Sequence, residues 1–83
     1  MNFGEAIAAL KVGKKVSREG WNGKGMFLFL ADGIEFSTVA EIGPARPVSV
    51  SPSIVMKTTQ DDFVVGWLTS QTEILAEDWK IWE

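Results

Sequence analysis

Hydrophobic residues at the start of the chain recur with the period of a helix. Asn2 stands three residues before Glu5, which is the spacing of a capping box. An apolar stripe follows at positions i, i+4 and i+7, formed by Phe3, Ile7 and Leu10. Gly13 then suits the left-handed turn that ends many helices. The pattern therefore predicts an N-terminal helix that stops near Gly13.

Strand-like patterns follow this helix. Residues 14–17 predict a short strand with Val16 turned inward, and residues 26–31 form an uninterrupted apolar run. A strand that is apolar on both faces needs a cover on each face. The N-terminal helix can supply one cover, and either a partner subunit or another layer of this chain must supply the second.

Turn residues divide the middle of the chain. Asp32-Gly33 and the alternation over residues 34–37 predict a hairpin with its return strand. Residues 40–53 contain all three prolines and several valines, which predicts an ordered but irregular loop. Two further strands are expected on either side of a polar turn, at residues 54–58 and 63–65.

The C-terminal part predicts a short helix and a last strand. Ser70 and Glu73 have capping-box spacing, so a helix is expected to about residue 76. Its core anchors are expected to be Ile74 and Leu75. The alternation over residues 78–82 predicts a terminal strand, which is expected to place Trp79 in the core and Trp82 on the opposite face.

The order of these elements predicts one α+β domain over residues 1–83. We expect a small antiparallel sheet with an N-terminal helix and a short C-terminal helix followed by a terminal strand. A chain of 83 residues has a small core, and association with further copies is a common remedy at this size.

Composition excludes several kinds of chemistry. The chain has no cysteine and no histidine, which removes thiolate nucleophiles, disulfides, cysteine metal sites and the commonest general base. The sequence therefore predicts no catalytic residue, metal or cofactor. Apolar runs stay far below the roughly 18 residues of a membrane span, and the first residues lack the features of a signal peptide. A soluble, cytoplasmic protein without membrane contact is expected.

The segment Arg18-Glu19-Gly20-Trp21-Asn22-Gly23-Lys24-Gly25-Met26 is the most informative part of the sequence. Five of the eight basic residues lie between positions 11 and 24, against a single acid. Trp21 is expected to be exposed in this glycine-rich loop, which favours a site for a flat, anionic ligand.

The same loop can also be read as a hairpin turn or compared with the standard nucleotide-binding motifs. Asn22-Gly23 is also a strong signal for a tight hairpin turn, and a turn that presents Trp21 agrees with ligand binding. Lys24 is followed by Gly25 where a P-loop needs Ser or Thr, and no G-x-G-x-x-G is present. The loop is therefore neither a P-loop nor a Rossmann dinucleotide-binding loop.

Trp67 is a second candidate for ligand contact. It follows Gly66 at the end of a predicted strand and precedes the predicted capped helix. Such a junction can direct a side chain into a pocket, while core packing is an equally open interpretation.

Several separated motifs also resemble one known family. They are M-N-F-G-E-A-I-x-x-L-K-x-G-K-K-V at the start, R-x-G-W-N-G-K-G-M from position 18, I-V-M-K-T from position 54, G-W-L-x-S-Q-T from position 66 and L-A-E-D-W from position 75. Together and in this order they resemble the small phage and prophage proteins of the Thoeris anti-defense 2 family.

The resemblance implies a function and a set of contacts. Family members are described as cytoplasmic homo-oligomers, dimers or tetramers, that bind a cyclic ADP-ribose-type signal such as glyco-cyclic ADP-ribose. They hold this signal without cleaving it, so the Thoeris effector is not activated. Some members are also thought to hold cyclic di- or trinucleotides. The part of the sequence from about residue 32 to 53 matches least, so ligand choice can differ from that of relatives.

On this sequence the resemblance implies two walls of a pocket. The first wall is the loop from Arg18 to Met26, where Trp21 would stack on a base or ribose and Asn22 would bond a ribose or base edge. Arg18 and Lys24 would face phosphate. The opposite wall would be formed by Trp67, Ser70 and Gln71 near a helix N-terminus, and pockets are expected between subunits.

Two other functions stay open at this point. The first is an enzyme that degrades the same signal, which the lack of histidine and of a spaced carboxylate pair disfavours. The second is a small protein-binding or nucleic-acid-binding module, since tryptophan and lysine also stack on single strands. The net charge of −3 weighs against long nucleic acids.

Overall fold

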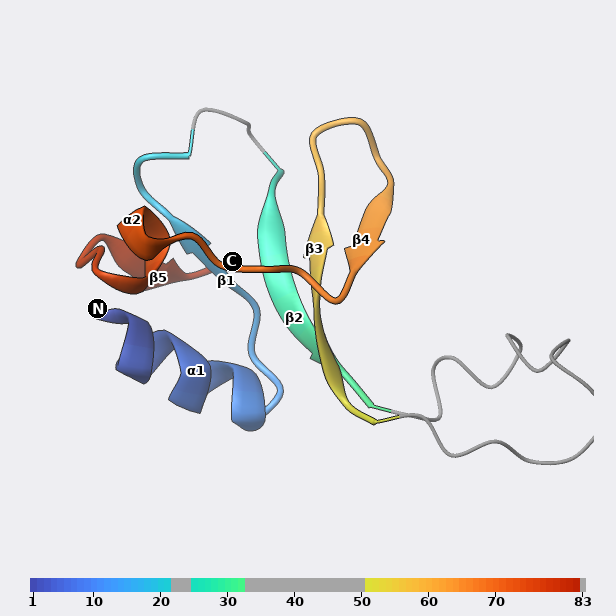
Figure 1. Ribbon diagram of the computed structural model, residues 1–83, viewed down its shortest axis with the longest axis horizontal. Helices are drawn as coiled ribbons and strands as arrows, with labels where there is room; N and C mark the ends of the chain where they lie inside the picture. Colours follow the sequence, from blue (N-terminus) through green and yellow to red (C-terminus); the bar gives the residue numbers. More distant parts are fainter. Residues whose placement is uncertain (22–24, 33–50, 83) are drawn as a thin grey trace, which may run out of the picture.

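A five-stranded antiparallel sheet forms the centre of the protein (Figure 1). The computed structural model describes residues 1–21, 25–32 and 51–82. The strands follow the order β4-β3-β2-β1-β5, and two helices accompany them. The elements in chain order are α1 (Phe3–Lys11), β1 (Val16–Arg18), β2 (Phe27–Ala31), β3 (Ser53–Lys57), β4 (Phe63–Val65), α2 (Gln71–Ile74) and β5 (Trp79–Ile81). The expected α+β class and element order are confirmed.

Helix α1 is closed at its N-terminus by the predicted capping box. The Asn2 side-chain oxygen accepts from Glu5 N at 2.8 Å, and Asn2 N donates to the Glu5 carboxylate at 2.9 Å. Gly13 follows the helix with a φ of 89°, a conformation that glycine adopts without strain. The helix lies against β5, β2 and β1, which are contiguous at one end of the sheet (Figure 1).

The core lies between α1 and this end of the sheet. In the sheet, Val16 is the register partner of Leu28 on one side and of Ile81 on the other. The buried members of the core are Ala6, Leu10, Val16, Leu28 and Trp79. The predictions that Val16 points inward and that Trp79 belongs to the core are both confirmed.

The other face of the sheet carries aromatic side chains and lysines. Because side chains alternate along a strand, Phe27 and Phe29 point away from the face that holds Leu28. The Phe27 ring lies 5.1 Å from the Trp82 ring and 6.2 Å from the Phe29 ring, measured between centroids. The Lys15 ammonium stands 4.8 Å from the Phe27 ring centroid. The second cover of β2 is therefore supplied in part by neighbouring side chains of this chain.

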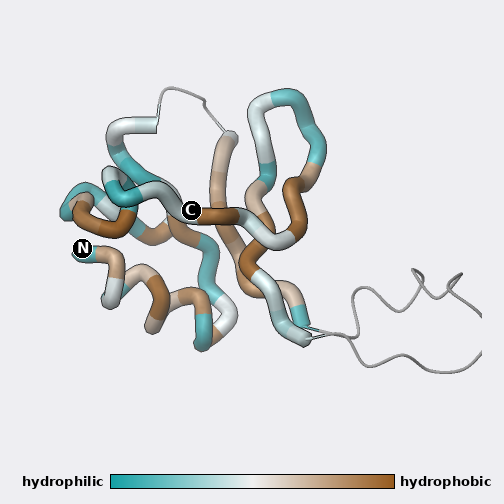
Figure 2. The backbone as a smooth tube through the Cα atoms, viewed as in Figure 1, coloured by the Kyte–Doolittle hydropathy of each residue, from teal (hydrophilic) through white to brown (hydrophobic). Residues whose placement is uncertain are grey.

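The hairpin of β3 and β4 agrees with its prediction. Thr58 N donates to Asp62 O at 2.9 Å across the turn, where Asp61 has a φ of 63°. The tube in Figure 2 is hydrophilic at this turn and largely hydrophobic along the strands. The predicted return strand at residues 34–37 and most of the predicted loop at 40–53 lie outside the described residues. Among the described strands, β2 pairs with β1 and β3.

The two edge strands of the sheet, β5 and β4, have different surroundings. At the β5 edge, Met1 N donates to Trp79 O at 2.7 Å and Met1 O accepts from Trp79 N at 3.1 Å. The opposite edge is β4, whose three apolar side chains are exposed. Neither helix of the described chain is long and apolar enough to cross a membrane.

One prediction about α2 is wrong. The helix ends at Ile74, earlier than expected, and Ile74 and Leu75 are exposed, Leu75 to 75%. A helix of four residues can direct only a few side chains toward the core. The contact with the core comes from Trp79, whose indole N–H donates to Glu73 O at 3.0 Å, and from the half-buried Ala76. Ile74 and Leu75 are therefore not core anchors.

Candidate functional site

Three tryptophans meet at the core end of the sheet. The Trp21 and Trp67 rings lie 6.5 Å apart, and they stand 5.4 Å and 6.5 Å from the Trp79 ring, between centroids. All three pairs are edge-to-face, with interplanar angles of 72° to 81°. We call Trp21, Trp67 and Trp79 the tryptophan cluster. The structure thus brings together two of the residues that the sequence proposed for opposite walls of a site.

Trp67 reaches the cluster through a sharp change of direction after β4. Gly66 has a φ of 75°, and both Gly66 N and Trp67 N donate to Ile54 O, at 3.1 Å and 2.9 Å. Beyond this point the chain crosses over the sheet toward α2 (Figure 1). Trp67 is half-buried against the core, so core packing and partial exposure both apply to it.

Trp21 is held by a turn that follows β1. Trp21 N donates to Arg18 O at 3.2 Å, which closes the turn. Glu19 N donates to Asp78 O at 3.0 Å, so the turn is also tied to the residue before β5. Trp21 is half-buried, so it is less exposed than the sequence predicted.

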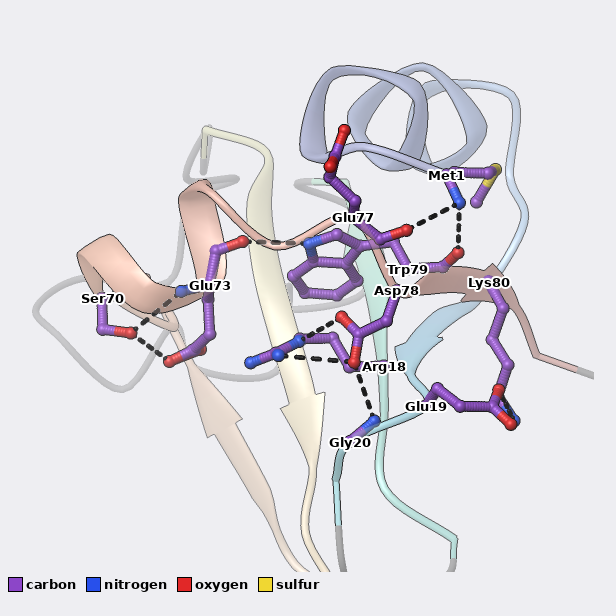
Figure 3. A network of polar contacts seen from close by, with 10 residues as sticks. All are labelled: Met1, Arg18, Glu19, Gly20, Ser70, Glu73, Glu77, Asp78, Trp79 and Lys80. Atoms are coloured by element: carbon purple, nitrogen blue, oxygen red, sulfur yellow. Dashed lines mark hydrogen bonds and ion pairs between the residues drawn. The ribbon is translucent and has the colours of Figure 1, made fainter.

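Asp78 anchors this turn through its side chain (Figure 3). Arg18 Nε donates to Asp78 Oδ1 at 2.8 Å and Arg18 Nη2 to Oδ2 at 3.4 Å, while Gly20 N donates to Oδ2 at 2.9 Å. The side chains of Arg18 and Asp78 are only 18% and 33% exposed. The pKa of Asp78 lies below its ordinary value, and the main cause is the hydrogen bond from Arg18. Desolvation opposes this effect, and the Gly20 N–H and the charge of Arg18 reinforce it.

The sequence interpretation missed Asp78. Asp78 is not among the predicted site residues, because its partner Arg18 lies far away along the chain. Only the pairing of β1 with β5 brings the two residues together, with Arg18 as the register partner of Trp79. No local sequence signal points to this contact, although Gly20 lies close to it, since a Cβ at that position would be 3.0 Å from Asp78 Oδ2.

The N-terminus of α2, which the sequence predicted as one wall of the site, attracts an anion less than expected. Ser70 Oγ accepts from Glu73 N at 3.3 Å and donates to the Glu73 carboxylate at 2.5 Å (Figure 3). The capping hydroxyl is thus already engaged, and the carboxylate adds negative charge at this end of α2. Gln71 is exposed at the first position of a helix of only four residues. The helix N-terminus therefore carries little of the attraction expected from it.

The remaining predicted contacts fall in different places. Met26 is half-buried directly before β2. Asn22 and Lys24 lie outside the described residues. Lys15 belongs to the opposite face of the sheet, where its ammonium stands over Phe27. Lys15 therefore does not join Arg18 in a patch beside Trp21.

The described residues offer no evident centre for metal chemistry. Within residues 1–21, 25–32 and 51–82, no group of three or more acidic side chains is placed to hold a metal ion. Asp78 directly precedes Trp79, and its carboxylate is already bonded to Arg18. The arrangement is suited to holding an aromatic ligand by ring contact.

Comparison with known proteins places these features in a family. Residues 1–82 match the family model of the Thoeris anti-defense 2-like domain. The curated protein Thoeris anti-defense 2 of Bacillus phage SP01 is 42% identical over 83 residues, which covers 98% of this chain and 93% of that protein. The match spans α1, the whole sheet and α2, and it agrees with the resemblance of the separated motifs. This chain belongs to the Thoeris anti-defense 2-like family.

Proposed function

We propose that this chain counters Thoeris defense by sequestering a cyclic ADP-ribose-type signal, such as glyco-cyclic ADP-ribose, without cleaving it. It would act in the cytoplasm of a bacterium that carries the phage or prophage. Family membership supports the anti-Thoeris role. The observation that carries the binding mechanism is the meeting of Trp21 and Trp67 against the buried Trp79.

The tryptophan cluster has the properties that a nucleotide platform needs. Trp79 is 2% exposed and is fixed by its bond to Glu73 O, so it provides a rigid support. Trp21 and Trp67 keep part of their surface accessible while resting on this support. Bases and aromatic side chains attract each other by about 1 to 3 kcal/mol per stacked base. Two such rings held in advance lose little conformational freedom when a ligand binds.

The composition favours holding the ligand over converting it. The sequence has neither histidine nor cysteine, and the nearby Asp78 has both carboxylate oxygens engaged by Arg18 and Gly20. A general base needs a free acceptor within hydrogen-bond reach of its substrate. Sequestration makes no such demand and requires only affinity and sufficient protein.

Other contacts remain proposals from sequence. Asn22 directly follows Trp21 in the chain, and Lys24 stands three positions after Trp21; they would supply an amide and a positive charge to the ligand. Gln71 is exposed near Trp67 along the chain and offers a neutral hydrogen-bonding group. Cyclic di- or trinucleotides share the same bases and phosphates, so they form a second group of candidate ligands.

A tight site also favours association of several copies. Capturing a nanomolar signal requires about −12 kcal/mol of binding free energy, which demands an enclosed ligand. Within the tryptophan cluster, Trp21 and Trp67 keep accessible surface and Trp79 does not, so one subunit would cover a ligand from one side. We propose a dimer or tetramer in which a second subunit completes the pocket. Among the described residues, the exposed apolar side chains of β4 and of Leu75 are available for such contacts.

A capture and recovery experiment tests the proposed function. Glyco-cyclic ADP-ribose is mixed with excess protein, the free ligand is removed by filtration, and the retained fraction is heated to denature the protein. Sequestration predicts that the ligand is retained and then released intact, as identified by mass spectrometry. Loss of intact ligand that grows with time would instead show an enzyme, and absence of retention would refute ligand binding.

Matched variants connect capture to the tryptophan cluster. Trp67→Ala is expected to weaken retention because it removes one of the two accessible rings. The neighbouring Leu68→Ala serves as the control, since Leu68 is 90% exposed and its ring-free side chain belongs to no part of the cluster. Equal retention by both variants would show that Trp67 does not contact the ligand.

A further inference from the structure

The polar contacts of Asp78 converge on the turn that carries Trp21. Asp78 lies just before β5 and Arg18 ends β1, and the two strands pair through Arg18 and Trp79. Asp78 binds three consecutive residues: the Arg18 guanidinium, Glu19 N and Gly20 N. Trp21 N then bonds to Arg18 O. We call Arg18, Asp78 and the backbone of Glu19 and Gly20 the turn clamp.

Arg18 is committed to this clamp. Its Nε and Nη2 face the two oxygens of Asp78 at 2.8 Å and 3.4 Å (Figure 3). Such a charge-assisted, two-point contact is stronger than a neutral hydrogen bond and fixes the plane of the guanidinium. Both side chains are largely shielded from solvent, which limits exchange with water.

The pair also offers little net attraction to a phosphate. The Asp78 carboxylate lies directly against the guanidinium, so the two unit charges largely cancel for a ligand farther away. A phosphate that drew Arg18 outward would separate it from Asp78 and bring two negative groups together. These observations disfavour the phosphate contact that the resemblance implied for Arg18.

We infer that Arg18 and Asp78 serve ligand binding as positioning residues, because their clamp holds the Glu19–Trp21 turn so that Trp21 rests on Trp79. The inference rests on the proposed function, in which Trp21 contacts the ligand. The clamp fixes the backbone on the N-terminal side of Trp21, and Trp79 fixes one edge of its ring. A ring held in this way need not be ordered when the ligand arrives.

A double-mutant cycle tests the inference through binding. The affinity for glyco-cyclic ADP-ribose is measured by titration calorimetry for wild type, Arg18→Gln, Asp78→Asn and the double variant, at several salt concentrations. Each single variant is expected to bind ~3- to 10-fold more weakly, which is the effect of losing one ordered side chain. The double variant is expected to bind no more weakly than the weaker single variant, because both changes open the same clamp.

A direct phosphate contact by Arg18 predicts a different outcome. In that case Arg18→Gln would lose more affinity than Asp78→Asn and would reduce the salt dependence of binding, because one charge contact with the ligand would be gone. Either result would overturn the inference. Lys80→Gln is the matched control, since it makes the same change of charge and breaks the nearby Lys80–Glu19 ion pair, which is exposed. It is expected to leave affinity unchanged.

A measurement on the ligand-free protein separates this inference from the proposed function. Tryptophan is replaced by 5-fluorotryptophan, and the fluorine resonance of Trp21 is assigned with the Trp21→Phe variant. Arg18→Gln and Asp78→Asn are expected to shift and broaden the Trp21 resonance and to leave that of Trp82, on the opposite face, in place. An unchanged Trp21 resonance in both variants would refute the positioning role. This test of the positioning role does not depend on ligand binding. If wild type fails to bind the ligand, that failure counts against the proposed function alone.

Discussion

The indole rings of Trp21 and Trp79 meet edge to face, with centroids 5.4 Å apart and ring planes at 78°. Trp79 is buried and bonded through its indole N–H to Glu73 O, so it cannot turn to follow its neighbour. Trp21 therefore has two environments. One part of its ring packs on the core, and the other part is accessible from solvent.

This double role predicts that Trp21→Ala lowers both affinity and stability. Removal of a half-buried ring from the edge of the core is expected to reduce the free energy of unfolding by roughly 1 to 3 kcal/mol. A stacking contact of similar size is lost from ligand binding. Urea denaturation measures the first effect and titration calorimetry the second, under conditions where the variant is folded.

Trp21→Phe is the control for this prediction. Phenylalanine keeps an aromatic edge against Trp79, so the free energy of unfolding should fall by less than in Trp21→Ala. If both variants were as stable as wild type, the ring contact between Trp21 and Trp79 would contribute nothing to the core.

Local sequence patterns predicted the elements well because each signal lies within a few residues. The Asn2–Glu5 capping box marks the start of α1, and it is formed in the structure. Alternation over residues 78–82 placed Trp79 in the core, where it is buried. The α+β class follows from the order of these elements.

The geometry of the candidate site depends on contacts that local patterns do not contain. Trp21 was expected to be exposed because glycines surround it, but Asp78 draws its turn onto β5. Leu75 was expected in the core because it follows a capped helix start, but that helix has only four residues. For Trp21 a partner beside a distant strand decides the outcome, and that partner is known only once the sheet order is known. For Leu75 the length of the helix decides it.

Gly20 gives a further prediction about the turn clamp. A Cβ at this position would lie 3.0 Å from Asp78 Oδ2 and 3.6 Å from Arg18 Nη2. Gly20→Ala is therefore expected to displace the carboxylate and to lower the free energy of unfolding by about 1 kcal/mol, the typical contribution of one hydrogen bond. Urea denaturation of the purified variant provides the measurement.

Gly4→Ala supplies the matched control. Gly4 lies inside α1, and a Cβ there would meet only Asn2 Oδ1 at 3.4 Å, an ordinary contact. Alanine in a helix is more stable than glycine by roughly 0.5 to 1 kcal/mol. The same substitution should thus have opposite signs at the two positions, and a stabilising Gly20→Ala would contradict the tight contact with Asp78.

The lowered pKa of Asp78 predicts a loss of stability in acid. Its pKa in the folded state lies below the unfolded value, so the unfolded chain takes up the proton first as the pH falls. The contribution is complete above the unfolded value of about 3.9, and it disappears as the pH falls through the lower folded value. Urea denaturation from about pH 6 to pH 3 should show this loss in wild type.

Two variants identify the group responsible. Asp78→Asn cannot titrate, so its free energy of unfolding should decline less steeply below about pH 4 than that of wild type. Asp61→Asn is the control, because its carboxylate is 90% exposed and asparagine tolerates the φ of 63° at that position. If Asp61→Asn removed the acid-dependent loss and Asp78→Asn did not, the assignment to Asp78 would be wrong.

Ser17 lies at the centre of β1 and points away from the face that holds Val16. The residue is 3% exposed, and its hydroxyl oxygen has no hydrogen-bond partner in the part of the chain that the structure describes. A buried hydroxyl without a partner has given up its bonds to water and gained none in return.

Ser17→Ala is therefore expected to leave the free energy of unfolding unchanged or to raise it by up to about 1 kcal/mol, because alanine removes an unsatisfied polar group and little volume. The same substitution at Ser70 should have the opposite sign. Ser70 caps α2 by accepting from Glu73 N, and loss of a cap lowers stability by roughly 0.5 to 2 kcal/mol. Urea denaturation of both variants in one buffer compares them directly. A destabilised Ser17→Ala would show that the hydroxyl has a partner and that this strand is held by one more polar contact.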